Sequence, residues 1–154
     1  MNKLLATLLL CLPFATYAND FHIDLPLAAY HLGGQTEGNY KLNDNQLGTG
    51  LGLGYRFGDK FNYGPEVMTF KNSWRNQSTF VGGDIGYNLN DKVRLGLFVG
   101  VIDGYGTDPT QYKPALAPTL EVKVIENVSA NVAYLQSTVP GGHSAFGFNI
   151  GFHF

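Results

Sequence analysis

Ser73 and His31 are the residues of this 154-residue chain whose types could form a nucleophilic pair. A serine hydroxyl reacts well only when a base takes its proton, and imidazole is suited to that role near neutral pH. Ser73 lies in the stretch 70–74, which separates two runs of alternating apolar residues, and His31 ends an earlier run. Loops at a sheet rim often carry function, so both residues are candidates for catalysis. The runs are not adjacent, which leaves open whether the two side chains meet.

The other histidines predict no metal site. We expect His22 to precede the sheet, His143 to lie in a glycine-rich loop and His153 to face the interior, and no two have metal-ligand spacing. The glycines at 48, 50, 52 and 54 alternate strictly and open no helix, so they indicate a strand rather than a phosphate-binding loop. We therefore expect no metal and no other cofactor.

Alternation of apolar and small or polar residues is the dominant pattern and predicts strands. Eight such runs occur between turn signals: 24–32, 47–57, 63–69, 78–87, 93–101, 115–125, 128–135 and 145–154. Most are long enough to cross a bilayer when tilted, and an even number lets an antiparallel sheet close without edges. The pattern predicts an all-β fold, an eight-stranded antiparallel transmembrane β-barrel. A soluble barrel or sandwich is the alternative, but it would expose many large apolar side chains to water.

Composition agrees with a barrel in the outer membrane. Charged residues make up only 14% of the chain, aromatic residues another 14%, and there are 20 glycines. A net charge of −2 argues against nucleic acid as a partner. Charges of both signs are predicted to face the lumen and to form an ion-pair network in its lower part: Arg56, Glu66, Asp84, Arg94, Glu121 and Lys123.

The first residues resemble a secretory signal peptide. Lys3 precedes an apolar stretch, 4–14, and small residues allow cleavage after Ala18. We expect residues 1–18 to be the signal peptide and 19–154 to form the barrel domain, in the outer membrane of a Gram-negative cell. The single cysteine, Cys11, would leave with the signal, so no disulfide is expected in the mature chain.

Three prolines predict local gaps in the barrel wall. Pro26, Pro118 and Pro140 lie within strands or at their ends, where proline removes a donor from the hydrogen-bond ladder. Such gaps would let a lipid chain enter sideways. The alternative is that the prolines only shape turns, and it applies most directly to Pro140.

Two motifs resemble the lipid A palmitoyltransferase family (PagP). The first is Pro26-Leu27-Ala28-Ala29-Tyr30-His31, with proline five residues before histidine, and the second is Met68-Thr69-Phe70-Lys71-Asn72-Ser73-Trp74. The resemblance covers most of the mature chain and is distant. It implies an eight-stranded outer-membrane barrel that moves an acyl chain from phospholipid to lipid A, with His31 and Ser73 at two catalytic positions.

The chain differs from that family at two of these positions. Asn72 stands where the family has aspartate, and an amide can orient an imidazole but not balance its charge. Asp84 falls near the glycine that floors the family's acyl pocket, so we place Asp84 at the lumen floor.

The leading hypothesis is an outer-membrane lipid acyltransferase acting as a monomer on phospholipid and lipopolysaccharide. Its catalytic residues would be His31, Ser73 and Asn72, and its substrate-binding residues Lys71, Trp74 and Tyr30. The alternatives are a non-enzymatic structural or surface-interaction barrel, acting through loops 33–45 and 103–112, and a barrel that binds an apolar ligand in its lumen.

Overall fold

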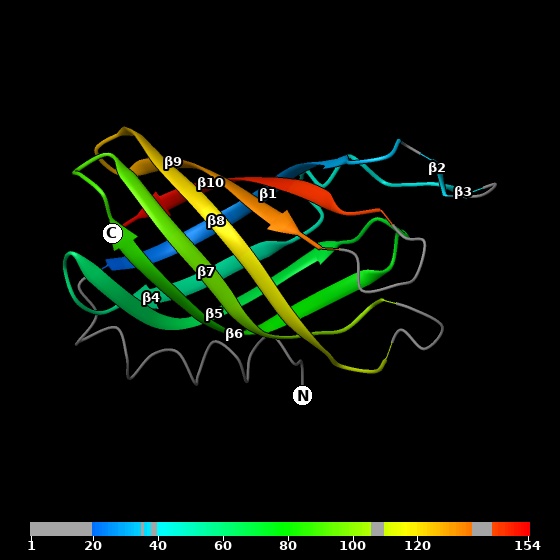
Figure 1. Cartoon of the computed structure of the whole chain (residues 1–154), viewed down its shortest axis with the longest axis horizontal. Coiled ribbons are helices and arrows are strands. Elements are labelled where there is room, and N and C mark those ends of the chain that lie inside the picture. Colours follow the sequence, from blue (N-terminus) through cyan, green and yellow to red (C-terminus); the bar gives the residue numbers. More distant parts are fainter. Residues whose placement is uncertain (1–19, 35, 38–39, 106–109, 137–142) are drawn as a thin grey trace.

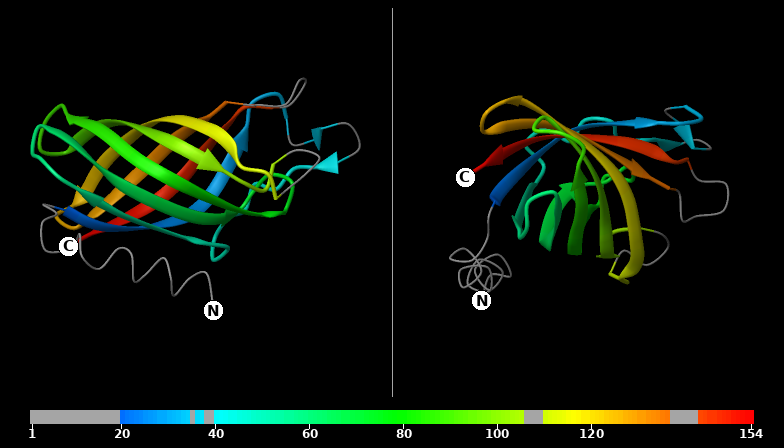
Figure 2. Two further views of the ribbon diagram at one scale, coloured as in Figure 1. Left: turned by 90° about the horizontal axis from the view of Figure 1, so that it is seen from below. Right: turned by 60° about the vertical axis from the view of Figure 1, so that its left-hand side comes forward.

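The structure, a computed structural model, describes residues 20–34, 36–37, 40–105, 110–136 and 143–154, and it is a closed antiparallel barrel (Figures 1 and 2). The predicted fold class is therefore confirmed. The barrel strands follow in chain order: β1 (Asp20–His31), β4 (Leu51–Arg56), β5 (Phe61–Lys71), β6 (Gln77–Asn88), β7 (Val93–Ile102), β8 (Lys113–Ile125), β9 (Val128–Leu135) and β10 (Ala145–His153). A small separate hairpin, β2 (Thr36–Glu37) and β3 (Tyr40–Lys41), projects from the end with the longer connections (Figure 1). We call this the loop end, and the opposite end, with the short connections, the turn end.

Each strand pairs with its neighbours in the sheet, and β1 closes the barrel by pairing with both β10 and β4. The seam between β1 and β10 runs from His22 opposite His153 to His31 opposite Ala145. At the turn end, Phe21 and Phe154 also exchange backbone hydrogen bonds. No helix among the described residues is long and apolar enough to cross a membrane.

The outer wall is apolar, as a bilayer requires. Exposed side chains on it include Val81, Ile85, Leu95, Val99, Leu116, Leu120, Val122 and Phe152. Exposed aromatic rings lie near both ends of the barrel, at Phe61, Tyr63, Tyr87 and Phe154 toward the turn end and at Tyr30 and Tyr112 toward the loop end. An apolar band between two aromatic girdles is the pattern of transmembrane barrels.

An ion-pair network fills the lumen at the turn end, as the sequence predicted. Arg56 contacts three carboxylates, with Nε 3.0 Å from Asp84, Nη1 3.3 Å from Asp20 and Nη2 2.9 Å from Glu121. Arg94 Nη2 lies 2.6 Å from the same Asp84 oxygen. One prediction for this network was wrong, because Lys123 is exposed near the end of β8.

The largest differences from the predicted strand boundaries are at the starts of β1 and β4. β1 begins at Asp20 rather than at residue 24, so His22 lies inside the wall and its buried side chain faces the lumen. The alternation there was hidden because the inward residues are polar. β4 begins at Leu51 rather than 47, because the segment 42–46 leaves the line of β4 and crosses to β1, where Gln46 N donates to Leu27 O.

A β-bulge in β1 decides which way its upper half faces. The pairing with β10 shifts between Pro26 and Ala28, so Leu27 is the extra residue. Below the bulge the buried residues have even numbers, and above it Ala29 and His31 are buried while Tyr30 is exposed. Unbroken alternation would have turned His31 outward.

The wall has two places where ladder pairing stops short of the loop end. Pairing of β8 with β9 begins at Thr119 opposite Ala133, so Pro118 is the first β8 residue without a β9 partner, although it still pairs with β7. The two strands diverge toward the loop end (Figure 1). Pairing of β1 with β4 likewise stops at Asp24, just before Pro26.

The network predicts that Asp84 is essential for stability. Replacing Asp84 with alanine leaves two buried guanidinium groups without their shared carboxylate, so we expect a loss of about 3–5 kcal/mol in the free energy of unfolding. Urea unfolding followed by tryptophan fluorescence in micelles measures it, with Lys123→Ala as the exposed control. Equal stability of the two variants would contradict this account.

Candidate functional site

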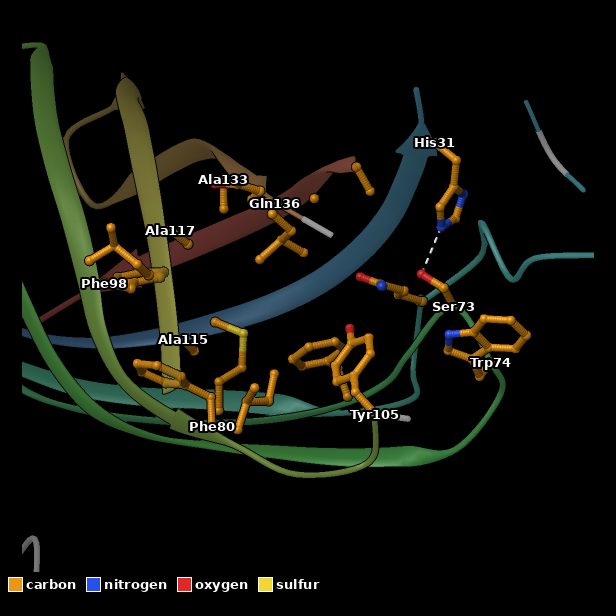
Figure 3. A pocket seen from close by; sticks show the side chains of 18 of the residues that line it. His31, Ser73, Trp74, Phe80, Phe98, Tyr105, Ala115, Ala117, Ala133 and Gln136 are labelled. Carbon is orange, nitrogen blue, oxygen red and sulfur yellow. Dashed lines mark hydrogen bonds between the residues drawn. The ribbon is translucent and has the colours of Figure 1, made fainter. Parts of the chain in front are cut away.

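His31 and Ser73 meet at the loop end of the lumen. His31 Nε2 lies 2.7 Å from Ser73 Oγ, within hydrogen-bond distance (Figure 3). His31 is 2% exposed and Ser73 is half-buried, so the pair is shielded yet reachable. This is the contact that general-base activation of a serine hydroxyl requires.

The loop that carries Ser73 is built on the Asn72 side chain. Asn72 Oδ1 accepts from the backbone N–H groups of Trp74 (2.9 Å) and Asn76 (3.1 Å). Its Nδ2 donates to Ser78 Oγ (2.9 Å) and to the Gly104 carbonyl (2.7 Å). Because these four bonds use the whole capacity of the amide, Asn72 fixes the loop and has nothing left with which to orient the His31 ring.

The segment 42–46 connects the two members of the pair. Asn43 N donates to Ser73 O over 2.8 Å, and Ala29 N donates to Asp44 O over 2.8 Å. One short stretch therefore holds both the strand of His31 and the loop of Ser73. Their mutual position depends on backbone hydrogen bonds rather than on side chains alone.

An apolar cavity of about 420 Å³ lies beside this pair (Figure 3). Ligand pockets typically measure roughly 300–1,000 Å³. Its apolar lining includes Met68, Phe70, Phe80, Phe98, Ile102, Ala115, Leu116, Ala117, Ala133 and Leu135, and its polar lining includes His31, Ser73, Trp74, Tyr105 and Gln136. The residues on β8 and β9 that face it are mainly small, which leaves space against the aromatic side chains of β5, β6 and β7. An alkyl chain fits this environment.

The predicted substrate-binding residues lie on two sides of the wall. Trp74 lines the cavity, whereas Lys71 and Tyr30 are exposed and do not line it. Lys71 follows the inward-facing Phe70 on β5, so strand alternation turns it outward. Tyr30 is turned outward by the same alternation between Ala29 and His31.

The prediction for Asp84 as the floor of this cavity was wrong. Asp84 is buried in the arginine network and does not line the cavity. Asp84 stands opposite Phe98 in the sheet, and the Phe98 side chain lines the cavity instead. The acyl-sized space is therefore lined mainly by apolar side chains, and Asn149 is among its polar lining residues. Pro140 lies outside the described residues.

A second serine–histidine pair, which sequence reasoning missed, lies at the turn end. Ser129 Oγ is 2.9 Å from His153 Nε2, and His153 Nδ1 is 3.1 Å from both Asp20 oxygens. The order matches a catalytic triad. Ser129 is 0% exposed, and no cavity found among the described residues is lined by it. Without room for a substrate we assign this second pair to structure, and the cavity distinguishes the His31–Ser73 pair from it.

No family model and no curated protein matches the chain. Among solved structures, the chain is similar to a de novo designed transmembrane β-barrel, with TM-score 0.60, 14% identity, and 89% of this chain and 97% of the other covered. It is also similar to the outer-membrane protein Ail of Yersinia pestis in a phospholipid bilayer nanodisc, with TM-score 0.57, 15% identity, and 88% and 99% covered. Crystal structures of Ail, one in complex with the heparin analogue sucrose octasulfate, give TM-score 0.54 at 17% identity, with 88% and 98% covered. These likenesses establish the fold of small transmembrane barrels.

The Asn72 bonds predict that an aspartate is harmful at this position. In Asn72→Asp a carboxylate oxygen replaces Nδ2 and faces the Gly104 carbonyl oxygen at hydrogen-bond distance. We expect a loss of about 1–3 kcal/mol in the free energy of unfolding, measured by urea titration in micelles. The exposed Asn90→Asp is the matched control, because Asn90 Oδ1 likewise accepts from two backbone N–H groups, those of Lys92 and Val93, and the carboxylate keeps both bonds. A gain in stability for Asn72→Asp would show that the loop is held differently.

Proposed function

We propose that this chain is an outer-membrane lipid acyltransferase, which moves an acyl chain from a phospholipid to lipid A or to another acceptor of the outer leaflet. The observation that supports the proposal most is the hydrogen bond between His31 and Ser73 beside an apolar cavity. A water-shielded alkyl site next to an activated hydroxyl is what acyl transfer from a lipid ester needs.

The proposed reaction has two halves. His31 Nε2 takes the Ser73 proton while Oγ attacks the ester carbonyl of the phospholipid, and the lysophospholipid alkoxide leaves with the proton that His31 returns. His31 then takes the proton of the acceptor hydroxyl, whose oxygen attacks the acyl-serine ester, and His31 returns the proton to Oγ as the Ser73 oxygen leaves. The acyl chain stays in the cavity between the two steps.

The gap between β8 and β9 offers the acyl chain of a phospholipid a lateral route from the bilayer into the cavity. Leu116 lies in the part of β8 that pairs with β7 but not with β9, and it is 59% exposed, yet it also lines the cavity. Ala115, Ala117 and Leu135 line the same region from the two diverging strands. The cavity therefore reaches the wall where the ladder is open, which supports the lateral-access role of Pro118.

The outward residues at the loop end suit lipid head groups. Lys71 offers a cation and Tyr30 an amphipathic ring at the height of the His31–Ser73 pair, and Trp74 borders the cavity. Phosphate groups of phospholipid and lipopolysaccharide carry the negative charge that Lys71 would bind. In this proposal the chain acts as a monomer, because the whole site lies within one barrel.

A non-enzymatic barrel that binds an apolar ligand is the second candidate. The cavity alone supports it, because an alkyl-sized space serves storage or sequestration as well as transfer. A surface-interaction role through the loops is the further variant, and the Ail structure with sucrose octasulfate shows that a barrel of this fold binds a sulfated ligand. The ligand-binding barrel and the surface-interaction barrel both predict that the protein leaves the lipid composition of the membrane unchanged.

The acyltransferase proposal predicts a lipid modification that depends on Ser73. Mass spectrometry of outer-membrane lipids from expressing cells should show an added acyl mass, which is lost in Ser73→Ala and reduced by roughly 10²–10⁴-fold in His31→Gln. The initial rate of transfer in micelles gives the same comparison in vitro.

The second serine–histidine pair supplies the control for this experiment. Ser129→Ala removes a buried serine–histidine hydrogen bond outside the cavity, so it should keep full transfer. A folded Ser73→Ala protein that modifies lipid as well as the parent rejects the proposal. No modification by any variant, with an alkyl ligand retained after purification, favours the ligand-binding barrel.

Lateral entry between β8 and β9 predicts inhibition by a reversible cross-link. In the double variant Pro118→Cys/Tyr134→Cys, the two cysteines lie at the positions that would pair next if the ladder continued beyond Thr119–Ala133 toward the loop end. Oxidation draws the strands together, so transfer should fall, and reduction should restore it. An unchanged rate of transfer by the fully oxidised protein would reject entry between β8 and β9 and would favour entry at the break between β1 and β4.

A further inference from the structure

Three ionisable side chains meet in the lower lumen, away from the cavity. His22 Nε2 lies 2.9 Å from Glu66 Oε2 and 3.8 Å from Asp24 Oδ2. The side chains of His22 and Asp24 are each 1% exposed, and that of Glu66 is 0% exposed. His22, Gly54 and Glu66 form one row across β1, β4 and β5, and Asp24 stands opposite Gly52. Because β4 contributes only glycines here, the three side chains meet above its backbone.

The charge of this cluster is not balanced by the arginines. Arg56 is held by Asp20, Asp84 and Glu121, and Arg94 by Asp84 and the Asn62 amide. Within the described part of the lumen, Asp24 and Glu66 therefore share His22 as their directly contacting cationic group. Even a protonated imidazole leaves one negative charge in excess, and an uncompensated buried charge is costly.

One oxygen of the cluster also has an unused acceptor position. Glu66 Oε1 is fully buried and makes no hydrogen bond. A Cβ placed on Gly52 would lie 3.4 Å from this oxygen and 3.0 Å from both Asp24 Cβ and Met68 Cε, so the free oxygen lies on the side of Asp24, next to the Met68 methyl group. Buried polar atoms are nearly always satisfied, so an unpaired carboxylate oxygen within a cluster of ligand-type residues favours a bound ion.

We propose that His22, Asp24 and Glu66 bind a divalent transition-metal ion of the Zn²⁺ type. One ligand atom from each residue lies within 4.8 Å of the others. Two donor atoms on a tetrahedral Zn²⁺ ion are about 3.3 Å apart, given metal–ligand distances near 2.0–2.1 Å, and the separations of 2.9 and 3.8 Å bracket this value. A divalent ion with neutral His22 balances both carboxylates.

Two neighbouring positions complete the site. Asn131 Nδ2 donates to Asp24 Oδ1 over 2.7 Å, which leaves Oδ2 directed at the cluster. Any side chain at Gly54 would collide with Glu66 Oε2 and with the His22 ring. The metal would join β1 to β5 across β4 and so stabilise the barrel beside its seam, independently of the proposed lipid chemistry.

The test uses the full barrel, purified without a histidine tag, folded in micelles and treated with chelator. Zn²⁺ alone is the probe. We expect a single Zn²⁺ ion to remain bound per chain after desalting, a rise in unfolding temperature with Zn²⁺, and a tetrahedral absorption band when Co²⁺ replaces it. Ser73→Ala should bind Zn²⁺ as the parent does.

Variants locate the ion. Glu66→Gln should lower the Zn²⁺ affinity at least about tenfold, and Asn131→Leu, which removes a supporting contact, by roughly 10–100-fold. His143→Ala, near the loop end, is the control for adventitious binding and should change nothing. Failure of the folded parent to retain Zn²⁺, or equal retention by a folded Asp24→Asn/Glu66→Gln variant, overturns the proposal.

Discussion

The pairing of every backbone N–H and C=O group within the protein is the constraint on which this structure depends. In hydrocarbon an unpaired group costs several kcal/mol, so a spanning sheet must close. Most ladders of the barrel run on to the turn end, whereas two stop short of the loop end, where β8 leaves β9 and β1 leaves β4. The segment 42–46 partly bridges the second of these breaks. The open break is also where the cavity reaches the wall, so relaxed pairing and the candidate site occur together.

The lumen is divided by chemistry into two compartments. The turn end holds charged and amide side chains whose contacts are specific and directional, and the loop end holds apolar side chains around an open space. The boundary lies where Asp84 on β6 stands opposite Phe98 on β7. Because the charged compartment is filled by side chains that contact one another, it supports the barrel while the apolar compartment keeps its open space. This division makes a large cavity compatible with a stable small barrel.

The fold was predictable because a membrane barrel repeats one simple pattern, apolar side chains outward at every second position. The site was only half predictable. The residue types and their rim position indicated His31 and Ser73, but their contact depends on the Leu27 bulge, and a bulge leaves little trace in the residue pattern. Asn72 looked like a catalytic partner, because sequence does not show that four bonds within its surroundings occupy the amide. His22 was placed outside the sheet, and its contact with Glu66, two strands away in the barrel, could not be predicted from the sequence. The contact between Ser129 and His153 was overlooked, although both lie on the consecutive strands β9 and β10.

The seam between β1 and β10 has a consequence for how the protein reaches its folded state. Every other wall contact except β1–β4 joins strands consecutive in the chain, whereas the seam joins residues more than a hundred positions apart, such as Asp20 with His153 and Asp24 with Gly151. Closing so long a loop is entropically expensive and slow. We therefore expect pairing across the β1–β10 seam to follow the pairing of strands that lie close together in the chain. His31 lies at the loop end of this seam, opposite Ala145, so a change that weakens β1–β10 pairing would also disturb the serine–histidine pair.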